Sequence, residues 1–161
     1  MKLTGGKDPS QIIGLTDKSF LLQIAETGVD FIRWKTEKHF TSWLCLAPTK
    51  HESRKSNKKR KKKGNTKAGQ IFRETALSVA NSNYSALGGL YRRIKAKKGH
   101  RVAIKATARK IAVLYYNVMT KGIDYVEQGL IQYQQKFKEQ QIKRLQKQAK
   151  YLGLQLITPE I

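Results

Sequence analysis

The residues best suited to carry out a chemical reaction lie in one basic segment near the middle of the chain. Ser53 carries a hydroxyl and is followed directly by Arg54 and Lys55. A continuous row of six cations comes next: Lys58, Lys59, Arg60, Lys61, Lys62 and Lys63. Neighbouring cations favour an ionised serine and stabilise the charge that develops when its oxygen attacks a phosphate. Ser53 is therefore a candidate nucleophile, although serines in basic loops are more often only solvated.

The charge of the whole chain indicates a polyanionic partner. The sequence holds 33 Lys and Arg against 11 Asp and Glu, a formal net charge of +22. Self-repulsion on this scale opposes compaction, so a counter-charged partner is expected, with nucleic acid ahead of anionic membrane and acidic protein. A second set of cations falls on an expected helix and is predicted to lie along a phosphate backbone: Arg92, Arg93, Lys97 and Lys98. A solvated face or an import-like basic tract is the alternative interpretation.

Several classes of protein are disfavoured by composition. One cysteine excludes an internal disulfide, and three scattered histidines give no zinc pattern, so no metal site is predicted. The acids do not form a metal-dependent nuclease set. No apolar run reaches the ~20 residues of a membrane helix, and the first residues lack the apolar core of a signal peptide. We expect a cytoplasmic protein without membrane contact, in which Cys45 is a small buried hydrophobe.

The elements that would position these residues are all helical. Apolar spacings and capping residues predict an all-α fold of five to six helices with a disordered basic loop and an amphipathic C-terminal helix. The expected organisation is a flexible lead-in at 1–10, a helical hairpin at 11–48, a basic serine-bearing loop at 49–67, a helical core at 68–122, and an amphipathic helix with a tail at 123–161. The expected helices cover about 17–27, a segment after Thr36, 66–81, 87–99, 102–120 and 124–152.

The first hairpin is similar to a helix-hairpin-helix motif. In that motif a glycine-containing turn lets backbone N–H groups approach a phosphate, and a helix N-terminus adds a favourable dipole. Here Gly14 supplies one glycine, while Thr16 stands where the second usually lies. A plain helical hairpin is an equally good interpretation of this segment.

Longer stretches of the sequence resemble a known family. These are "RWKTEKHFTSWLCLAP", a polar spacer with a serine, "SALGGLYRRIKAKKG" and "AIKATARKIAVLYY". Over about residues 10–155 they are similar to the C-terminal domain of the "one-ten" insertion-sequence transposases, which are DEDD transposases or bridge-RNA-guided recombinases. The resemblance implies a bacterial, nucleoid-associated domain that binds DNA and exchanges its strands in transposition and recombination.

The resemblance also implies roles for individual residues. Ser53, five residues past Pro48, corresponds to the proposed nucleophile, and Mg²⁺ belongs to a RuvC-like nuclease domain with four acids. Two positions depart from the family: Cys45-Leu46 replaces a Gly-Leu, and Arg54 stands where a glycine is usual. We expect a truncated domain that is inactive alone and needs a RuvC-like domain in trans, with guide RNA and a homo-oligomer as further implied partners. The alternative is a non-catalytic nucleic-acid-binding protein of ribosomal-protein type.

Overall fold

The computed structural model shows an all-α chain. It describes residue 9 and residues 12–48 and 64–154, without the side chains of 123–130. Six helices and no strand are found in these residues, which confirms the predicted fold class. The helices are α1 (Asp17–Thr27), α2 (Glu37–Trp43), α3 (Lys67–Ala80), α4 (Ala86–Lys98), α5 (His100–Lys121) and α6 (Ile123–Tyr151). Of the basic loop expected at 49–67, residues 49–63 lie outside the described residues, as do most of the lead-in and the last seven residues, whereas Lys67 already begins α3.

Local sequence explains where the helices begin. Thr16, Thr36, Thr66 and Ser85 each precede a helix, and each side-chain oxygen accepts a hydrogen bond from the backbone N–H three residues later. Such a cap satisfies one of the N–H groups that a helix start leaves without a partner. Gly28 ends α1 with a φ of 74°, a conformation that glycine adopts without strain. The observed helices begin within two residues of the expected ranges 17–27, 66–81, 87–99, 102–120 and 124–152, and α2 follows Thr36 as expected.

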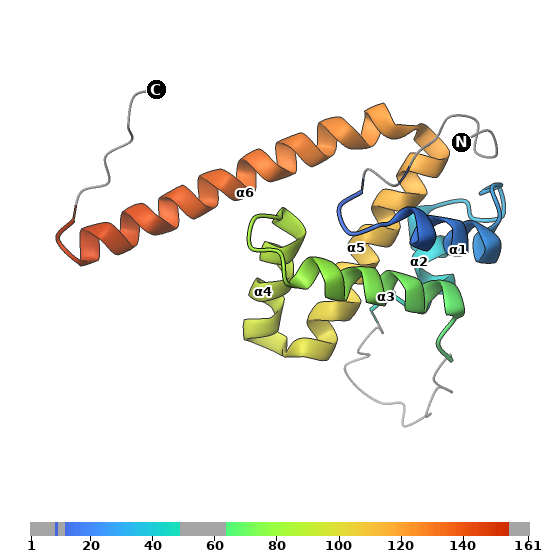
Figure 1. Cartoon of the computed structure of the whole chain (residues 1–161), viewed down its shortest axis with the longest axis horizontal. Coiled ribbons are helices and arrows are strands. Elements are labelled where there is room, and N and C mark those ends of the chain that lie inside the picture. The colour runs from blue at the N-terminus through green and yellow to red at the C-terminus, as the bar shows by residue number, and fades with distance from the viewer. Residues whose placement is uncertain (1–8, 10–11, 49–63, 155–161) are drawn as a thin grey trace, which may run out of the picture.

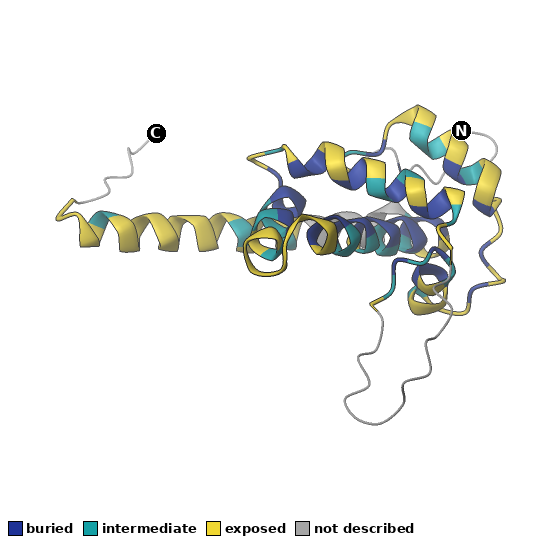
Figure 2. Cartoon of the chain, turned by 90° about the horizontal axis from the view of Figure 1, so that it is seen from below, coloured by how far each residue is buried: buried dark blue, intermediate teal, exposed yellow. Residues whose placement is uncertain are grey.

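Helix α5 is the centre of the fold. Helices α2, α3, α4 and α6 all pack on α5, while α1 lies on α3 (Figure 1). Buried residues concentrate on α3 and α5, whereas the distal part of α6 is exposed (Figure 2). α6 leaves the helical core and extends away from it (Figure 1). The long, largely buried α5 thus positions every other element, directly or through α3.

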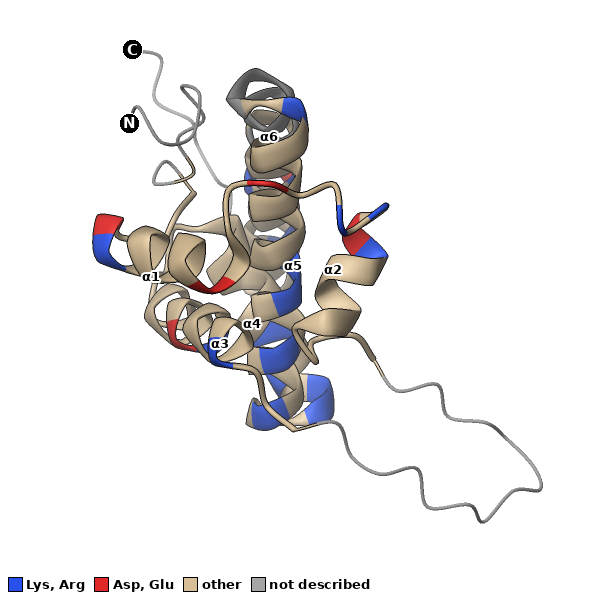
Figure 3. Cartoon of the chain, turned by 90° about the vertical axis from the view of Figure 1, so that its right-hand side faces the viewer, with Lys and Arg blue, Asp and Glu red and all other residues tan. Residues whose placement is uncertain are grey.

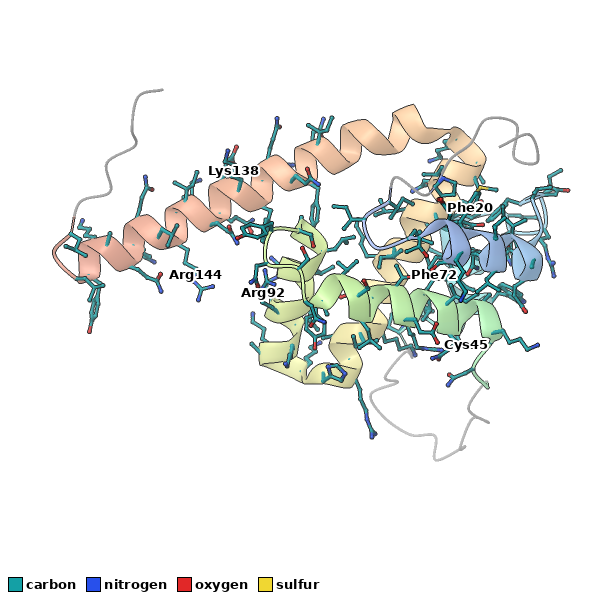
Figure 4. The ribbon with its side chains drawn as sticks, in the orientation of Figure 1. Phe20, Cys45, Phe72, Arg92, Lys138 and Arg144 are labelled. Carbon is teal, nitrogen blue, oxygen red and sulfur yellow. The ribbon has the colours of Figure 1, made fainter. Side chains whose placement is uncertain are left out.

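An aromatic cluster joins α2 to α5. Phe40 of α2 is fully buried and its ring lies 6.2 Å from Tyr115 and 5.7 Å from Tyr116, both on α5. The Tyr116 hydroxyl donates to the backbone carbonyl of Trp34 at 2.7 Å. Phe72 of α3 completes the contact with a ring centroid 5.5 Å from Tyr115 (Figure 4). The cluster fixes α2, and with it the position at which residues 49–63 leave the fold.

Because the phenol of Tyr115 is buried, we expect the fold to lose stability in alkaline solution. Burial raises the pKa of Tyr115 from 10.0 to about 12, partly offset by the Thr27 side chain. Between these values the unfolded chain releases the phenolic proton while the folded chain keeps it, so unfolding is favoured as pH rises. We expect a loss of roughly 2–3 kcal/mol from pH 10 to 12 relative to Tyr115→Phe, measured by denaturant unfolding of both proteins. Parallel stability curves for the two proteins would contradict this assignment.

Candidate nucleic-acid interface

Helices α4 and α5 form a hairpin without acidic residues. Between Thr75 and Ile123 the chain holds ten Lys and Arg and no Asp or Glu. These cations are Arg92, Arg93, Lys95, Lys97, Lys98, Arg101, Lys105, Arg109, Lys110 and Lys121. Lys95, Lys97 and Lys98 fall in the last turn of α4, where the helix dipole favours positive charge. The hairpin is therefore a region of unbroken positive charge on a rigid scaffold.

One face of α5 carries what we call the α5 stripe: Arg101, Lys105 and Arg109. The spacing of four places the three cations on one side of the helix. Ala112 and Tyr116 continue the same side, and there the helix packs on the segment before α2 through Tyr116. Arg101 is exposed, and Lys105 and Arg109 are half-buried, so their stems pack on the helix surface.

The cations of the α5 stripe have no acidic partner within the described part of the chain. None of the three makes a hydrogen bond or ion pair there. Figure 3 shows Lys and Arg gathered along α5 below α2.

The described chain stops at Pro48 and resumes at Gly64 close to this stripe. The Leu44 carbonyl lies against Gly69 of α3, which holds the two ends of the segment together. Figures 1 and 3 both place these ends on the side of the molecule that carries the turn between α4 and α5. Ser53, Arg54, Lys55 and the row from Lys58 to Lys63 lie outside the described residues, so their roles stay predictions.

The four cations predicted on α4 do not all share one face of the helix. The Arg92 guanidinium donates to the Ser82 carbonyl at 2.8 Å and to the Asn83 carbonyl at 3.1 Å, so it holds the turn between α3 and α4 (Figure 4). Arg93 and Lys97, four residues apart, share an exposed face. Lys98 is exposed on another side. Phosphate contact by all four stays a prediction, with Arg92 already committed to a structural bond.

The α5 stripe was not among the residues predicted to bind nucleic acid. Two signals in the sequence point to it. One is the absence of acids over the whole hairpin, and the other is the spacing of four between Arg101, Lys105 and Arg109. The row from Lys58 to Lys63 is denser in charge than this stripe.

The backbone conformation at Cys45 favours the glycine that the resemblance implies at this position. It is half-buried, not buried as expected, and its φ of 57° is the one positive value found at a described non-glycine residue. A side chain in this conformation costs about 1 kcal/mol that glycine avoids. The Gly-Leu pattern that the resemblance implies thus has a backbone reason at position 45, three residues before the described segment ends at Pro48.

We expect Cys45→Gly to stabilise the fold because it removes that strain. The expected gain in the free energy of unfolding is about 0.5–1 kcal/mol, measured by denaturant unfolding. Cys45→Ala keeps the Cβ atom and serves as the control, with no expected gain. If both substitutions raised the free energy of unfolding equally, the thiol and not the backbone conformation would be the source of the lost stability.

The turn before α1 is built for packing on α3. Gly14 has a φ of 90°, and a Cβ atom there would collide with the Val79 side chain of α3. α1 packs on α3, and α2 packs on α5. The helix-hairpin-helix interpretation stays a prediction, because most of the residues before Ile12 lie outside the described residues.

Among the described residues, no three His, Cys, Asp or Glu side chains lie close enough together to hold a metal ion. None of the described helices is both long and apolar enough to cross a membrane.

The fold and the site define a strongly basic, all-α domain with a cationic helical hairpin. The family model of the Transposase IS116/IS110/IS902 family matches residues 11–92, about half of the chain. The chain belongs to this family of insertion-sequence transposases, as its sequence resemblance indicated. The match spans α1 to α3 and the first half of α4, and the α5 stripe lies beyond it. No match was found among curated proteins or among solved structures.

Proposed function

We propose that this chain is the DNA-binding and strand-exchange domain of an insertion-sequence transposase. Membership of the transposase family supports the class of reaction. The observation that carries DNA binding is the α5 stripe, three cations that have no acidic partner among the described residues, on a helix beside the points where the described chain stops at Pro48 and resumes at Gly64. Protein cations that neutralise DNA phosphates release counterions, which makes binding favourable and sensitive to salt.

In this proposal two parts of the interface contact the DNA phosphates. The α5 stripe is a fixed surface for the DNA backbone, since its helix is held by α2, α3 and α4. The row from Lys58 to Lys63 supplies six further charges on a segment whose two ends are anchored near that surface. Phosphate contacts of this kind position the DNA without reading its bases. Guide RNA, which the family resemblance implies, would then determine the target sequence.

In the proposed strand exchange, Ser53 is the nucleophile. Its oxygen attacks a scissile phosphate, so an O–P bond to serine forms and the bond from phosphorus to one deoxyribose oxygen breaks. The serine proton passes to solvent, and the released deoxyribose oxygen takes up a proton to become a hydroxyl. Arg54 and Lys55 would offset the negative charge of the pentacoordinate transition state. The metal-dependent nuclease activity would come from a RuvC-like domain, supplied in trans in the experiment below.

Binding is tested by the salt dependence of affinity for duplex DNA. We expect the logarithm of the association constant to fall linearly with the logarithm of salt concentration, by about 0.9 for each phosphate contact. The α5 stripe alone then contributes a slope of about 2.7. An affinity independent of salt would refute the phosphate contacts on which the proposal rests.

Strand exchange is tested by covalent trapping. The protein is incubated with supercoiled DNA, with and without a RuvC-like domain and guide RNA from a related transposase, and then denatured. We expect a protein–DNA adduct that Ser53→Ala abolishes, while DNA affinity stays unchanged. The matched control is Ser56→Ala, which removes a nearby hydroxyl in the same basic segment. If no adduct forms under any of these conditions, the nucleophile assignment fails and DNA binding alone remains.

A further inference from the structure

A cleft of about 470 Å³ lies between α6 and the turn that joins α3 to α4. Its volume falls within the roughly 300–1,000 Å³ of small-ligand sites. One wall is the turn, which contributes Ser82 and Tyr84, and the other is α6, which contributes Gln134, Lys138 and Gln141. Figure 1 shows α6 passing beside this turn. None of these residues takes part in the strand exchange proposed above.

The turn presents an aromatic ring to solvent on a braced backbone. Tyr84 is 96% exposed, and its ring has no stacking partner among the described residues. The Arg92 guanidinium donates to the backbone carbonyls of Ser82 and Asn83, the two residues before Tyr84. The Ser82 hydroxyl also accepts from the backbone N–H of Ser85 at 3.3 Å. Because the backbone is already ordered, little conformational entropy is lost when a ligand stacks on the ring.

The α6 wall carries two amide groups with an ammonium group between them. Gln134, Lys138 and Gln141 are spaced by four and three, so they share one side of the helix. At 1.5 Å per residue, the two glutamines lie about 10 Å apart along the axis. None of the three forms a hydrogen bond or ion pair in the described part of the chain. Phe137 lies against Gly89 of α4, where a Cβ atom would collide with its ring, so this contact holds α6 beside the turn.

The side chains of the cleft suit a nucleotide better than a cation or an apolar molecule. No acidic side chain is among the described residues that line it, so the lining does not suit a cation. A glutamine amide both donates and accepts hydrogen bonds, as the edge of a nucleobase does. Unpaired bases also stack on exposed aromatic rings such as that of Tyr84. The ammonium group of Lys138 matches the charge of one phosphate.

We propose that this cleft binds one unpaired nucleotide of a nucleic-acid strand. The base stacks on Tyr84, its edge meets the amide of Gln134 or Gln141, and Lys138 neutralises the adjoining phosphate. A base within a duplex is already stacked and paired, so the cleft selects single strands, whereas the α5 stripe contacts only phosphates. The inference rests on the proposed function for the class of ligand, and on the cleft itself for the site.

Positive charge continues from the cleft toward the α5 stripe. Gly89, Arg93 and Lys97 of α4 are spaced by four and lie on one side of the helix. Gly89 faces α6 at the cleft, while Arg93 and Lys97 are exposed further along α4. The α5 stripe begins just beyond the end of α4, with Arg101. A strand that enters the cleft therefore keeps phosphate contacts along α4 while an adjoining duplex lies on α5.

Binding of single strands with and without bases tests the cleft. Decathymidylate is compared with an abasic strand of equal length by fluorescence anisotropy, at about 0.3 M salt to weaken the phosphate contacts. We expect the strand with bases to bind about tenfold more tightly, the usual order of effect for one base stacked on an aromatic ring. Tyr84→Ala is expected to remove this preference and Tyr84→Phe to keep it. Tyr151→Ala, which removes another ring that is 90% exposed, is the control with no effect.

Binding of duplex DNA by the same proteins separates this inference from the proposed function. Tyr84→Ala should bind duplex DNA as tightly as the unchanged protein. Replacing the three cations of the α5 stripe with glutamine should weaken duplex binding but keep the preference for strands with bases. Decauridylate and its abasic analogue form the RNA arm, and the larger Tyr84-dependent preference identifies whether DNA or RNA occupies the cleft. Equal affinity for strands with and without bases, or a preference that survives Tyr84→Ala, would overturn the proposal.

Photochemical crosslinking tests where the base lies. Decathymidylate that carries one central 5-bromouracil is bound to the full chain and irradiated, and mass spectrometry identifies the linked peptide. We expect linkage at Tyr84 or Phe137, the two aromatic residues that line the cleft. Linkage only at residues outside the cleft would contradict the proposed site, even if the protein prefers strands with bases.

Discussion

Replacing Arg101, Lys105 and Arg109 with glutamine is expected to weaken binding of duplex DNA roughly a hundredfold at 0.1 M salt, with a salt slope smaller by about 2.7. The three side chains share one face of α5 and have no acidic partner in the described residues, so their charge is available to phosphates. Glutamine keeps much of the side-chain length and favours helix, so the fold should be unaffected. Fluorescence anisotropy at several salt concentrations measures both quantities.

A matched variant distinguishes the effect of where the charges lie from the effect of the total charge on DNA affinity. Lys18→Gln, Lys35→Gln and Lys38→Gln together remove the same three charges, but from exposed positions around α1 and α2. Asp17 and Glu37 are chain neighbours there and offset the positive charge. This control is expected to lose less than about threefold in affinity, because charges beyond a Debye length are screened. Equal losses in both variants would show that only net charge matters and that α5 is no specific surface.

Phe40→Ala is expected to destabilise the fold by about 3–5 kcal/mol, the usual cost of removing a buried phenylalanine. Phe40 is 0% exposed, and its ring lies 4.9 Å from that of Trp34 and 5.4 Å from that of Phe31. Denaturant unfolding followed by far-ultraviolet circular dichroism measures the loss. Since marginal domains have only about 5–15 kcal/mol in total, partial unfolding at 37 °C is expected.

The matched control for Phe40 is Leu22→Ala on α1. Leu22 is 49% exposed, so its truncation should cost less than about 1 kcal/mol. If Phe40→Ala cost no more than Leu22→Ala, the aromatic cluster would not be what fixes α2 on α5. DNA affinity of the Phe40→Ala variant should fall together with its folded fraction, because α2 anchors one end of residues 49–63.

The helices were predictable because their signals are local. Thr16, Thr36, Thr66 and Ser85 each mark a start through a bond to the third following residue, and Gly28 marks an end. Apolar spacing then gave the buried faces. The identity of the family followed from residue patterns that span several of these elements, and the family match at residues 11–92 confirmed it.

The functional surface was harder to predict because it depends on packing between elements. Arg92 looks like a free cation in the sequence, and only the fold of the turn between α3 and α4 brings Ser82 to its guanidinium. Cys45 carries no sequence signal of its positive φ apart from the family's glycine. The α5 stripe becomes a distinct surface only in the fold, where the segment before α2 covers the same side of α5 through the bond from Tyr116 to Trp34. Ser53 lies outside the described residues, so its role rests on the family resemblance.

The location of bound DNA is the central claim, and lysine acetylation in the presence and absence of duplex DNA tests it most directly. Mass spectrometry then reports the reactivity of each lysine in the full chain. We predict that saturating DNA protects Lys105 of the α5 stripe and Lys98 at the adjacent turn, while Lys18 and Lys38 keep their reactivity. Unchanged reactivity of Lys105 in fully bound protein would contradict the assignment of α5 as the DNA-binding surface.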